Sequence, residues 1–204
     1  MLNLFFLLAI IPSIVLHEVS HGYVAYLCGD MTAKNAKRLT LNPLRHIDPF
    51  GTVILPLLLI FVGLPAFGYA KPVPVNVSRL RHPRNQSVYV SLAGPAVNIA
   101  LSFVGYLICE YAIHVSQQQW MLDFGVALGL VNLVLAVFNL LPIPPLDGSA
   151  VIERLVPQRN LASYYQLRNR ALPFVFIVII GFQLFFRNGE NPITWFENWW
   201  LNQL

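Results

Sequence analysis

The sequence carries very little charge. Of its 204 residues, 11% are charged and 56% are hydrophobic, whereas soluble domains typically carry about 25% charged residues. This shortage excludes an ordinary soluble domain and favours a bundle of membrane helices. Stripes of basic residues with interleaved aromatic residues are also missing. The net charge of +4 therefore predicts no nucleic-acid partner and is better interpreted as a topology signal.

Cysteine is scarce, and recognisable processing signals are missing. Cys28 and Cys109 lie far apart in apolar surroundings, which excludes a disulfide framework and a cysteine metal site. The first residues contain no basic leader and no small-residue cleavage site, so we expect a retained helix rather than a signal peptide. Internal repeats and low-complexity tracts are absent too. We expect a single membrane-embedded domain over residues 1–204.

The apolar residues are gathered into stretches that are candidates for membrane segments. A helix needs about 20 largely apolar residues to cross the bilayer. The first, third and fourth stretches meet this length, and the fifth is short. The second is short and contains Pro56 and Pro65, which predicts a re-entrant element rather than a crossing. The five stretches are Leu2–Leu27, Thr52–Phe67, Val88–Ile113, Leu122–Leu141 and Leu172–Phe186.

The basic residues predict how these segments are oriented. They gather after the first stretch, after the second, and between the fourth and fifth, while Ala112–Met121 contains none. Cytoplasmic loops are enriched in Lys and Arg, so we expect the three basic loops on the cytoplasmic side and Ala112–Met121 on the other. The second stretch must then enter and leave on one side. The prediction is an all-α polytopic membrane protein with four spanning helices, one re-entrant element and both termini outside.

The clearest chemical signal is the motif His17-Glu18-Val19-Ser20-His21. Residues four apart share a helix face, so both imidazoles can reach one metal ion. Glu18 lies on the adjacent face, where its carboxylate can accept a proton from water that the metal activates. Ionisable groups at membrane depth cost about 3 kcal/mol each and persist mainly where they are partnered or functional. The motif predicts a hydrolytic metal site; the alternative is a polar cap at the end of a helix.

Catalytic zinc needs a third protein ligand, and Asp147 is the best candidate. It follows Leu141–Leu146, whose prolines unwind the end of the fourth apolar stretch on the same predicted side as His21. An aspartate before Gly-Ser is also a common N-cap. Without the histidine pair, Asp147 would be assigned as an N-cap. Because the pair is present, we favour its assignment as a metal ligand. His46 lies in a proline-flanked loop and suits a structural or lid role.

Two asparagines lie in otherwise apolar stretches. Asn139 could hydrogen-bond the developing oxyanion or the scissile carbonyl, or it could form an interhelical bond that only aids packing. Asn98 has the same two interpretations, and the structural one is favoured. Gly94 and Ala96 beside it are small enough to let this helix approach the one that carries His17.

The segment after the re-entrant element cannot be helical. Val73, Val75 and Val77 alternate with Pro72, Pro74 and Asn76, and this pattern predicts a short edge-like β strand or hairpin. Such an edge could pair with an unwound substrate segment, which makes Lys71, Val73 and Val75 candidate substrate-binding residues. A simple loop between membrane elements fits the pattern equally well.

Four motifs together resemble those of the site-2 protease family, in that family's order. The resemblance covers the chain from about Leu2 to Gly148, in the compact prokaryotic form without a PDZ or CBS domain. It implies that His17, His21 and Asp147 bind one Zn²⁺ ion and that Glu18 is the catalytic base. The motifs are His17–His21, Asn42–Pro49, Leu92–Asn98 and Phe138–Gly148.

The resemblance also sets expectations for location and activity. It implies a multi-pass protein of the bacterial inner membrane, an active site reached by water from the cytoplasm, and regulated intramembrane proteolysis. The catalytic core would cover about residues 2–156. An accessory helix and tail would cover about 157–204, in which the tryptophans are spaced like an interfacial belt. These are Trp195, Trp199 and Trp200.

We therefore expect a zinc endopeptidase that cleaves transmembrane or juxtamembrane segments of membrane proteins. One alternative is a membrane metal-ion carrier with the same cluster as a transit site. Such transporters usually show paired broken helices in two related halves, and carriage gives Glu18 no role. The other alternative is a catalytically silent membrane-assembly protein.

Overall fold

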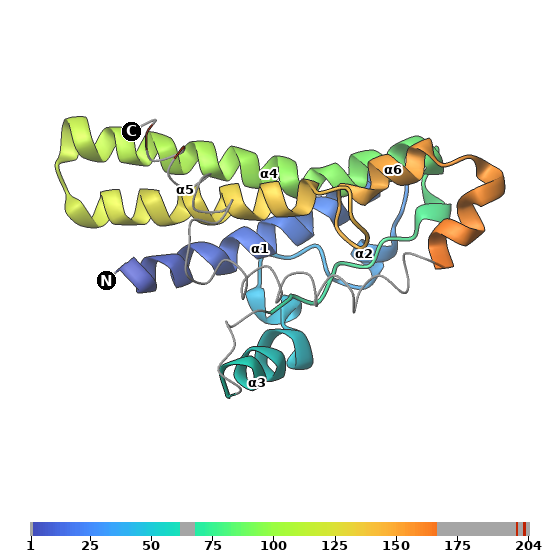
Figure 1. Cartoon of the computed structure of the whole chain (residues 1–204), viewed down its shortest axis with the longest axis horizontal. Coiled ribbons are helices and arrows are strands. Elements are labelled where there is room, and N and C mark those ends of the chain that lie inside the picture. Colours follow the sequence, from blue (N-terminus) through green and yellow to red (C-terminus); the bar gives the residue numbers. More distant parts are fainter. Residues whose placement is uncertain (1, 62–67, 167–198, 200–201, 203–204) are drawn as a thin grey trace.

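Three long helices form the body of the described part of the chain, and Figure 1 shows them side by side. The computed structural model describes residues 2–61, 68–166, 199 and 202. Within them, α1 (Leu2–Leu27), α4 (Pro83–Tyr111) and α5 (Gln119–Leu140) are long and apolar enough to cross a membrane. They coincide with the first, third and fourth apolar stretches, so these three predictions of long apolar helices are confirmed. The predicted fourth spanning helix, Leu172–Phe186, lies outside the described residues, as do Trp195 and Trp200.

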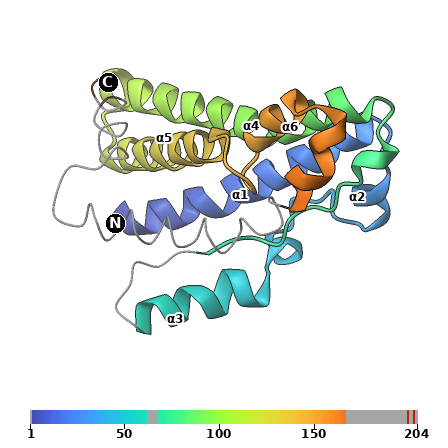
Figure 2. The same cartoon turned by 45° about the vertical axis from the view of Figure 1, so that its right-hand side comes forward.

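α1 and α5 run in the same direction, and α4 runs opposite to both (Figures 1 and 2). Ala9 of α1 shares a buried cluster with Ala127 and Leu128 of α5. α4 and α5 approach backbone to backbone, because a Cβ on Gly105 would lie 2.5 Å from the nitrogen of Gly129. Small residues permit such close helix contacts inside membranes. The basic loops require α4 to cross the membrane in the direction opposite to α1 and α5, and the observed helix directions agree with this requirement.

The connection from α1 to α4 is a series of short elements. The short apolar helix α3 stands apart from the three-helix body (Figures 1 and 2). The elements are α2 (Thr32–Asn35), a 3₁₀ turn Pro43–His46, a π-type turn Pro49–Ile54 that continues into α3 (Leu55–Phe61), and a 3₁₀ turn Val77–Arg79.

The residues on either side of the second apolar stretch, Gly51 and Tyr69, lie next to each other. The turn and α3 together run from Pro49 to Phe61, a length of about 20 Å at 1.5 Å per residue, which is shorter than the bilayer core of about 30 Å. The N–H of Tyr69 donates to the carbonyl of Gly51 at 3.0 Å, so the chain returns beside its point of departure. This geometry is what a re-entrant element needs. Re-entry into a membrane stays a prediction, and residues 62–67 lie outside the described chain.

The short β strand is not confirmed. The structure contains no strand among residues 2–61 and 68–166, and residues 69–76 run without regular secondary structure. A strand needs a neighbouring strand to pair with, whereas several backbone groups of this segment pair with side chains. Nη2 of Arg38 donates to the carbonyl of Lys71 at 2.8 Å, and the carboxylate of Asp30 accepts from the N–H of Asn76 at 2.6 Å.

The last described elements close one end of the body. After α5 the chain turns back and forms α6 (Ser149–Leu155), followed by a 3₁₀ turn Gln158–Asn160. Nη2 of Arg84, in the first turn of α4, donates to the carbonyls of Arg154 and Val156 at 3.1 and 2.8 Å. These bonds hold α6 against the start of α4.

Candidate active site

α1 presents two imidazoles on one face. His17 and His21 are one helical turn apart, and their Nε2 atoms lie 3.1 Å from each other. Glu18 is the next residue and extends on the adjacent face, as the spacing predicts. α1 remains helical through the whole motif. The first part of the predicted site is thus formed by the helix itself.

A loop brings Asp147 to this pair. Helix α5 ends at Leu140 because prolines follow it, and the chain folds back so that the N–H of Gly148 donates to the carbonyl of Asn139 at 2.7 Å. A Cβ on Gly148 would overlap the carbonyl group of Leu140, so this turn requires glycine. Oδ2 of Asp147 lies 3.2 Å from Nε2 of His17 and 3.4 Å from Nε2 of His21.

Asp147 does not cap a helix. The N-cap position of α6 is occupied by Gly148, and no side chain makes a capping hydrogen bond there. The carboxylate points instead at the imidazoles.

The three ligand atoms lie within about 0.2 Å of the spacing of a tetrahedral zinc site. In a tetrahedral site with bonds of about 2.0–2.2 Å, two ligand atoms are separated by about 3.3–3.6 Å. The separations among His17, His21 and Asp147 are 3.1, 3.2 and 3.4 Å. Oδ2 of Asp147 is also buried without a hydrogen-bond partner among the described residues. The cluster therefore fits a metal ion.

Both imidazoles are oriented through their other nitrogen. Nδ1 of His21 lies 2.7 Å from the carbonyl of Val90, which can only accept, so this nitrogen carries the proton. Nδ1 of His17 lies 2.5 Å from Oδ1 of Asn98. Gly94 of α4 faces both rings, since a Cβ there would lie 2.5–2.6 Å from ring atoms of both histidines. Ala96, which we expected to aid this approach, is exposed.

A cavity of about 360 Å³ opens beside the cluster. Its polar wall includes His17, His21, Asp147, Glu18 and Asn139, and its apolar wall includes Val73, Val75, Val90 and Leu146. Oε2 of Glu18 accepts a hydrogen bond from the N–H of Val73 at 2.9 Å. The cavity thus joins the predicted base to the segment that was predicted to bind substrate.

The remaining predicted residues lie at different distances from this cavity. Asn139 lines it and donates one amide hydrogen to the carbonyl of Leu135 at 2.9 Å. Asn98 is fully buried behind His17 and does not line the cavity. The side chain of Lys71 is exposed. His46 is buried away from the cluster, with Nε2 bonded to the carbonyl of Thr40 at 2.9 Å, as suits a structural role.

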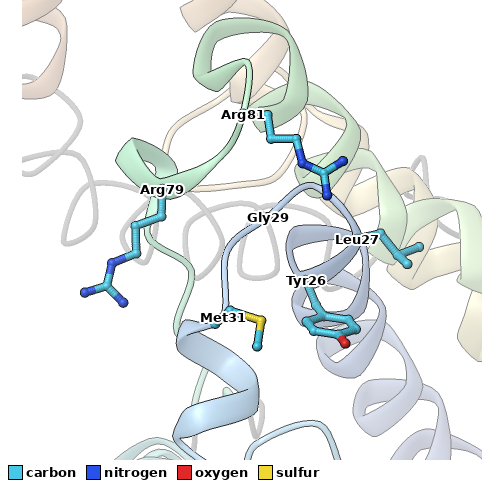
Figure 3. Close-up of a pocket in the computed structure, with 6 residues that line it drawn as sticks. All are labelled: Tyr26, Leu27, Gly29, Met31, Arg79 and Arg81. Atoms are coloured by element: carbon cyan, nitrogen blue, oxygen red, sulfur yellow. The ribbon is translucent and has the colours of Figure 1, made fainter.

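A second cavity, of about 570 Å³, lies at the end of α1 (Figure 3). Its two arginines, Arg79 and Arg81, extend in different directions, and it contains no carboxylate, histidine or cysteine side chain. Within the described chain, His17, His21 and Asp147 form the one group of three side chains that can hold a metal ion. The second cavity is therefore not the candidate site.

Sequence reasoning missed several residues that support the site. Asn132 was not noticed, although it lies seven residues before Asn139, two helical turns along the same face of α5. Arg38 and Asp30 hold the segment beside Glu18. The carbonyl of Val90 leaves no signal in the sequence, because every residue has one.

Comparison with known proteins gives a consistent picture. The family model described as Peptidase family M50 matches residues 5–117 and 111–182. YwhC of Bacillus subtilis is 41% identical over 182 residues, which cover 86% of this chain and 79% of YwhC. Rip2 of Mycobacterium tuberculosis is 35% identical over 174 residues, which cover 83% of this chain and 64% of Rip2. Both relatives carry names of zinc metalloproteases. No solved structure matches the chain.

Proposed function

The chain belongs to peptidase family M50 and is a membrane zinc metallopeptidase, and we propose that it cleaves transmembrane or juxtamembrane segments of other membrane proteins. The depth of the cluster carries this proposal. At 1.5 Å per residue, His17 lies about 22 Å from the start of α1 and about 15 Å from its end. Since α1 is long enough to span the bilayer, a cluster at this depth meets backbones that lie in the membrane or near its surface.

We assign His17, His21 and Asp147 as the ligands of one zinc ion. When bound, zinc lowers the pKa of water towards neutrality and polarises the scissile carbonyl. Glu18 takes the proton of the attacking water and delivers it to the leaving amine. Its bond with the N–H of Val73 keeps the carboxylate aimed into the cavity.

We further propose that residues 71–75 bind the substrate backbone. Val73 and Val75 both line the cavity, and in extended backbone alternate residues direct their N–H and C=O groups to the same side. The N–H of Val75 donates no hydrogen bond within the described chain. An unwound substrate segment pairing with this edge would bring its carbonyls beside Glu18. Lys71 is the exposed first residue of this proposed binding edge, and its carbonyl accepts a hydrogen bond from Arg38.

The two asparagines have different proposed roles. Asn139 lines the cavity and has a second amide hydrogen, which we assign to the oxyanion or the scissile carbonyl. Asn98 bonds to His17 and not to the cavity, so we assign it to holding that ligand. The basic loops near the end of α1 support a cytoplasmic opening of the site. We propose the bacterial inner membrane as the location and a single domain as the organisation.

The test is a cleavage assay with purified protein and a panel of tagged single-span substrates, together with metal analysis. Glu18→Gln should reduce cleavage by at least about 100-fold, as expected for loss of a general base, with the zinc content unchanged. His17→Ala should lose both zinc and cleavage. Substantial cleavage by Glu18→Gln would refute the assigned base. A chain that cuts soluble peptides but no membrane-embedded substrate would refute the proposed substrate class.

A further inference from the structure

A continuous chain of buried polar side chains leads from the metal cluster into the helix bundle. Oδ1 of Asn98 lies 2.5 Å from Nδ1 of His17, and Nδ2 of Asn98 donates to Oδ1 of Asn132 at 2.7 Å. Nδ2 of Asn132 donates to Oγ of Ser13 at 2.8 Å, and Ser13 donates to the carbonyl of Ala9 at 2.7 Å. Ser13, Asn98 and Asn132 have no exposed surface at all. The chain therefore joins α1, α4 and α5 at their common centre.

The direction of every bond in this chain is fixed by its inner end. The carbonyl of Ala9 can only accept, so Ser13 uses its hydroxyl hydrogen there and can only accept from Asn132. The carbonyl of Leu128, 2.9 Å from Nδ2 of Asn132, fixes the same amide orientation independently. Asn132 must then present its oxygen to Asn98, and Asn98 must present its oxygen to His17.

This polarity has a consequence for the metal cluster. Because Asn98 offers an oxygen, His17 must carry its proton on Nδ1, which leaves the lone pair of Nε2 directed at the cluster. We infer that Asn98, Asn132 and Ser13 form a directed hydrogen-bond relay that holds His17 in its metal-binding tautomer and orientation. Asn132 and Ser13 are positioning residues, since neither lines the cavity. The inference rests on the proposed assignment of His17 as a zinc ligand.

The second histidine is independent of the relay. His21 is held by the backbone carbonyl of Val90, and no residue of the relay bonds to it among the described residues. Removing the relay should therefore release His17 and leave His21 in place. A loss of general stability would affect both rings alike, so the difference between them separates positioning from packing.

The test uses the full chain in lipid nanodiscs and measures zinc affinity by competition with a chelator. Asn132→Leu keeps the size of the side chain and removes its amide, and we expect zinc affinity to fall about 10- to 100-fold, the usual effect of losing an outer-shell partner. Asn98→Leu should behave alike. Asn98→Asp retains an acceptor for His17 but loses the donor to Oδ1 of Asn132, so its zinc affinity should lie between those of Asn98→Leu and the wild type.

Ser102→Ala is the matched control, because Ser102 is also buried between α4 and α5 and donates to a backbone carbonyl, that of Gly129 at 3.0 Å. It stands outside the relay and should bind zinc normally. The ring ¹⁵N signals of the zinc-free protein supply a second measurement. His17 should be an Nδ1–H tautomer in the wild type and a mixture in Asn132→Leu, while His21 stays unchanged.

The outcomes separate the relay from the assignment of His17 as a zinc ligand. Wild-type zinc affinity and an unchanged His17 tautomer in Asn132→Leu would overturn the relay. An equal loss of affinity in Ser102→Ala, or equal failure of Asn98→Asp and Asn98→Leu, would also overturn it. Normal zinc binding by His17→Ala would instead overturn the ligand assignment on which the proposed function rests.

Discussion

Gly94→Ala tests the geometry of the metal cluster with a single added methyl group. A Cβ at this position would lie 2.5 Å from Cε1 of His17, 2.5 Å from Nε2 of His21 and 2.6 Å from Nε2 of His17. Ordinary contacts between such atoms begin at about 3.5 Å. The added carbon therefore falls between the two imidazoles, on the side where they face α4.

The size of the expected effect follows from these distances. Relieving the overlap requires the rings to move by about 1 Å, whereas zinc ligands tolerate deviations of only about 0.2 Å from their bond lengths. The rings cannot yield freely, because Asn98 and the carbonyl of Val90 hold them from behind. Overpacking of this kind costs about 1–3 kcal/mol. At 1.4 kcal/mol per factor of ten, zinc affinity should fall by about 10- to 100-fold.

The assay compares zinc affinity and thermal stability of Gly94→Ala with those of Ala96→Val. Ala96 lies on the same helix and is exposed, so the control adds methyl groups away from the cluster. We expect Gly94→Ala to lose zinc affinity and cleavage while retaining its helix content, and Ala96→Val to resemble the wild type. Wild-type zinc affinity in Gly94→Ala would refute the placement of both imidazoles against α4.

Two further predictions concern the segment beside Glu18. Arg38→Met keeps the stem of the side chain and removes the donor to the carbonyl of Lys71. A charged hydrogen bond contributes about 1.5–3 kcal/mol, so cleavage should fall about 10-fold or more with zinc affinity unchanged. Normal cleavage would contradict the proposed positioning of this segment. Val73→Pro removes the N–H that holds Glu18, and Val75→Pro removes the N–H proposed to pair with the substrate. Both should abolish cleavage of tagged substrates with zinc still bound, and unaffected cleavage by Val75→Pro would exclude pairing of the substrate with this segment.

Much of the site was predictable because its strongest signals are local. The four-residue spacing of His17 and His21 fixes a shared helix face, and the prolines before Asp147 fix where α5 must end. The long apolar helices follow from length and composition alone. Each of these predictions needs only neighbouring residues, together with the rule that ionisable groups inside a membrane require partners.

The supporting contacts were not predictable for physical reasons. Every residue has a backbone carbonyl, so the sequence does not reveal the role of the carbonyl of Val90. Arg38 resembles any basic loop residue in the sequence, and only the structure shows that its guanidinium is buried against a distant carbonyl. The predicted strand has the correct alternation, but pairing is a long-range property, and here Glu18 and Asp30 take the place of a neighbouring strand.

The balance of charge and hydrogen bonds at the cluster explains why these groups can lie together at membrane depth. Four buried side-chain atoms lack a hydrogen-bond partner in the described chain, and of these only Oδ2 of Asp147 belongs to a residue that lines the cavity. Nδ1 of each imidazole is already hydrogen-bonded. The atoms of the two rings and of Asp147 that still lack a partner are therefore the three ligand atoms that face one another. Two neutral imidazoles and the carboxylates of Asp147 and Glu18 sum to a charge of −2, which one divalent ion neutralises. Uncompensated charge inside a membrane is costly. The ion that supports hydrolysis would therefore also offset the free-energy cost of placing the carboxylates of Asp147 and Glu18 at membrane depth.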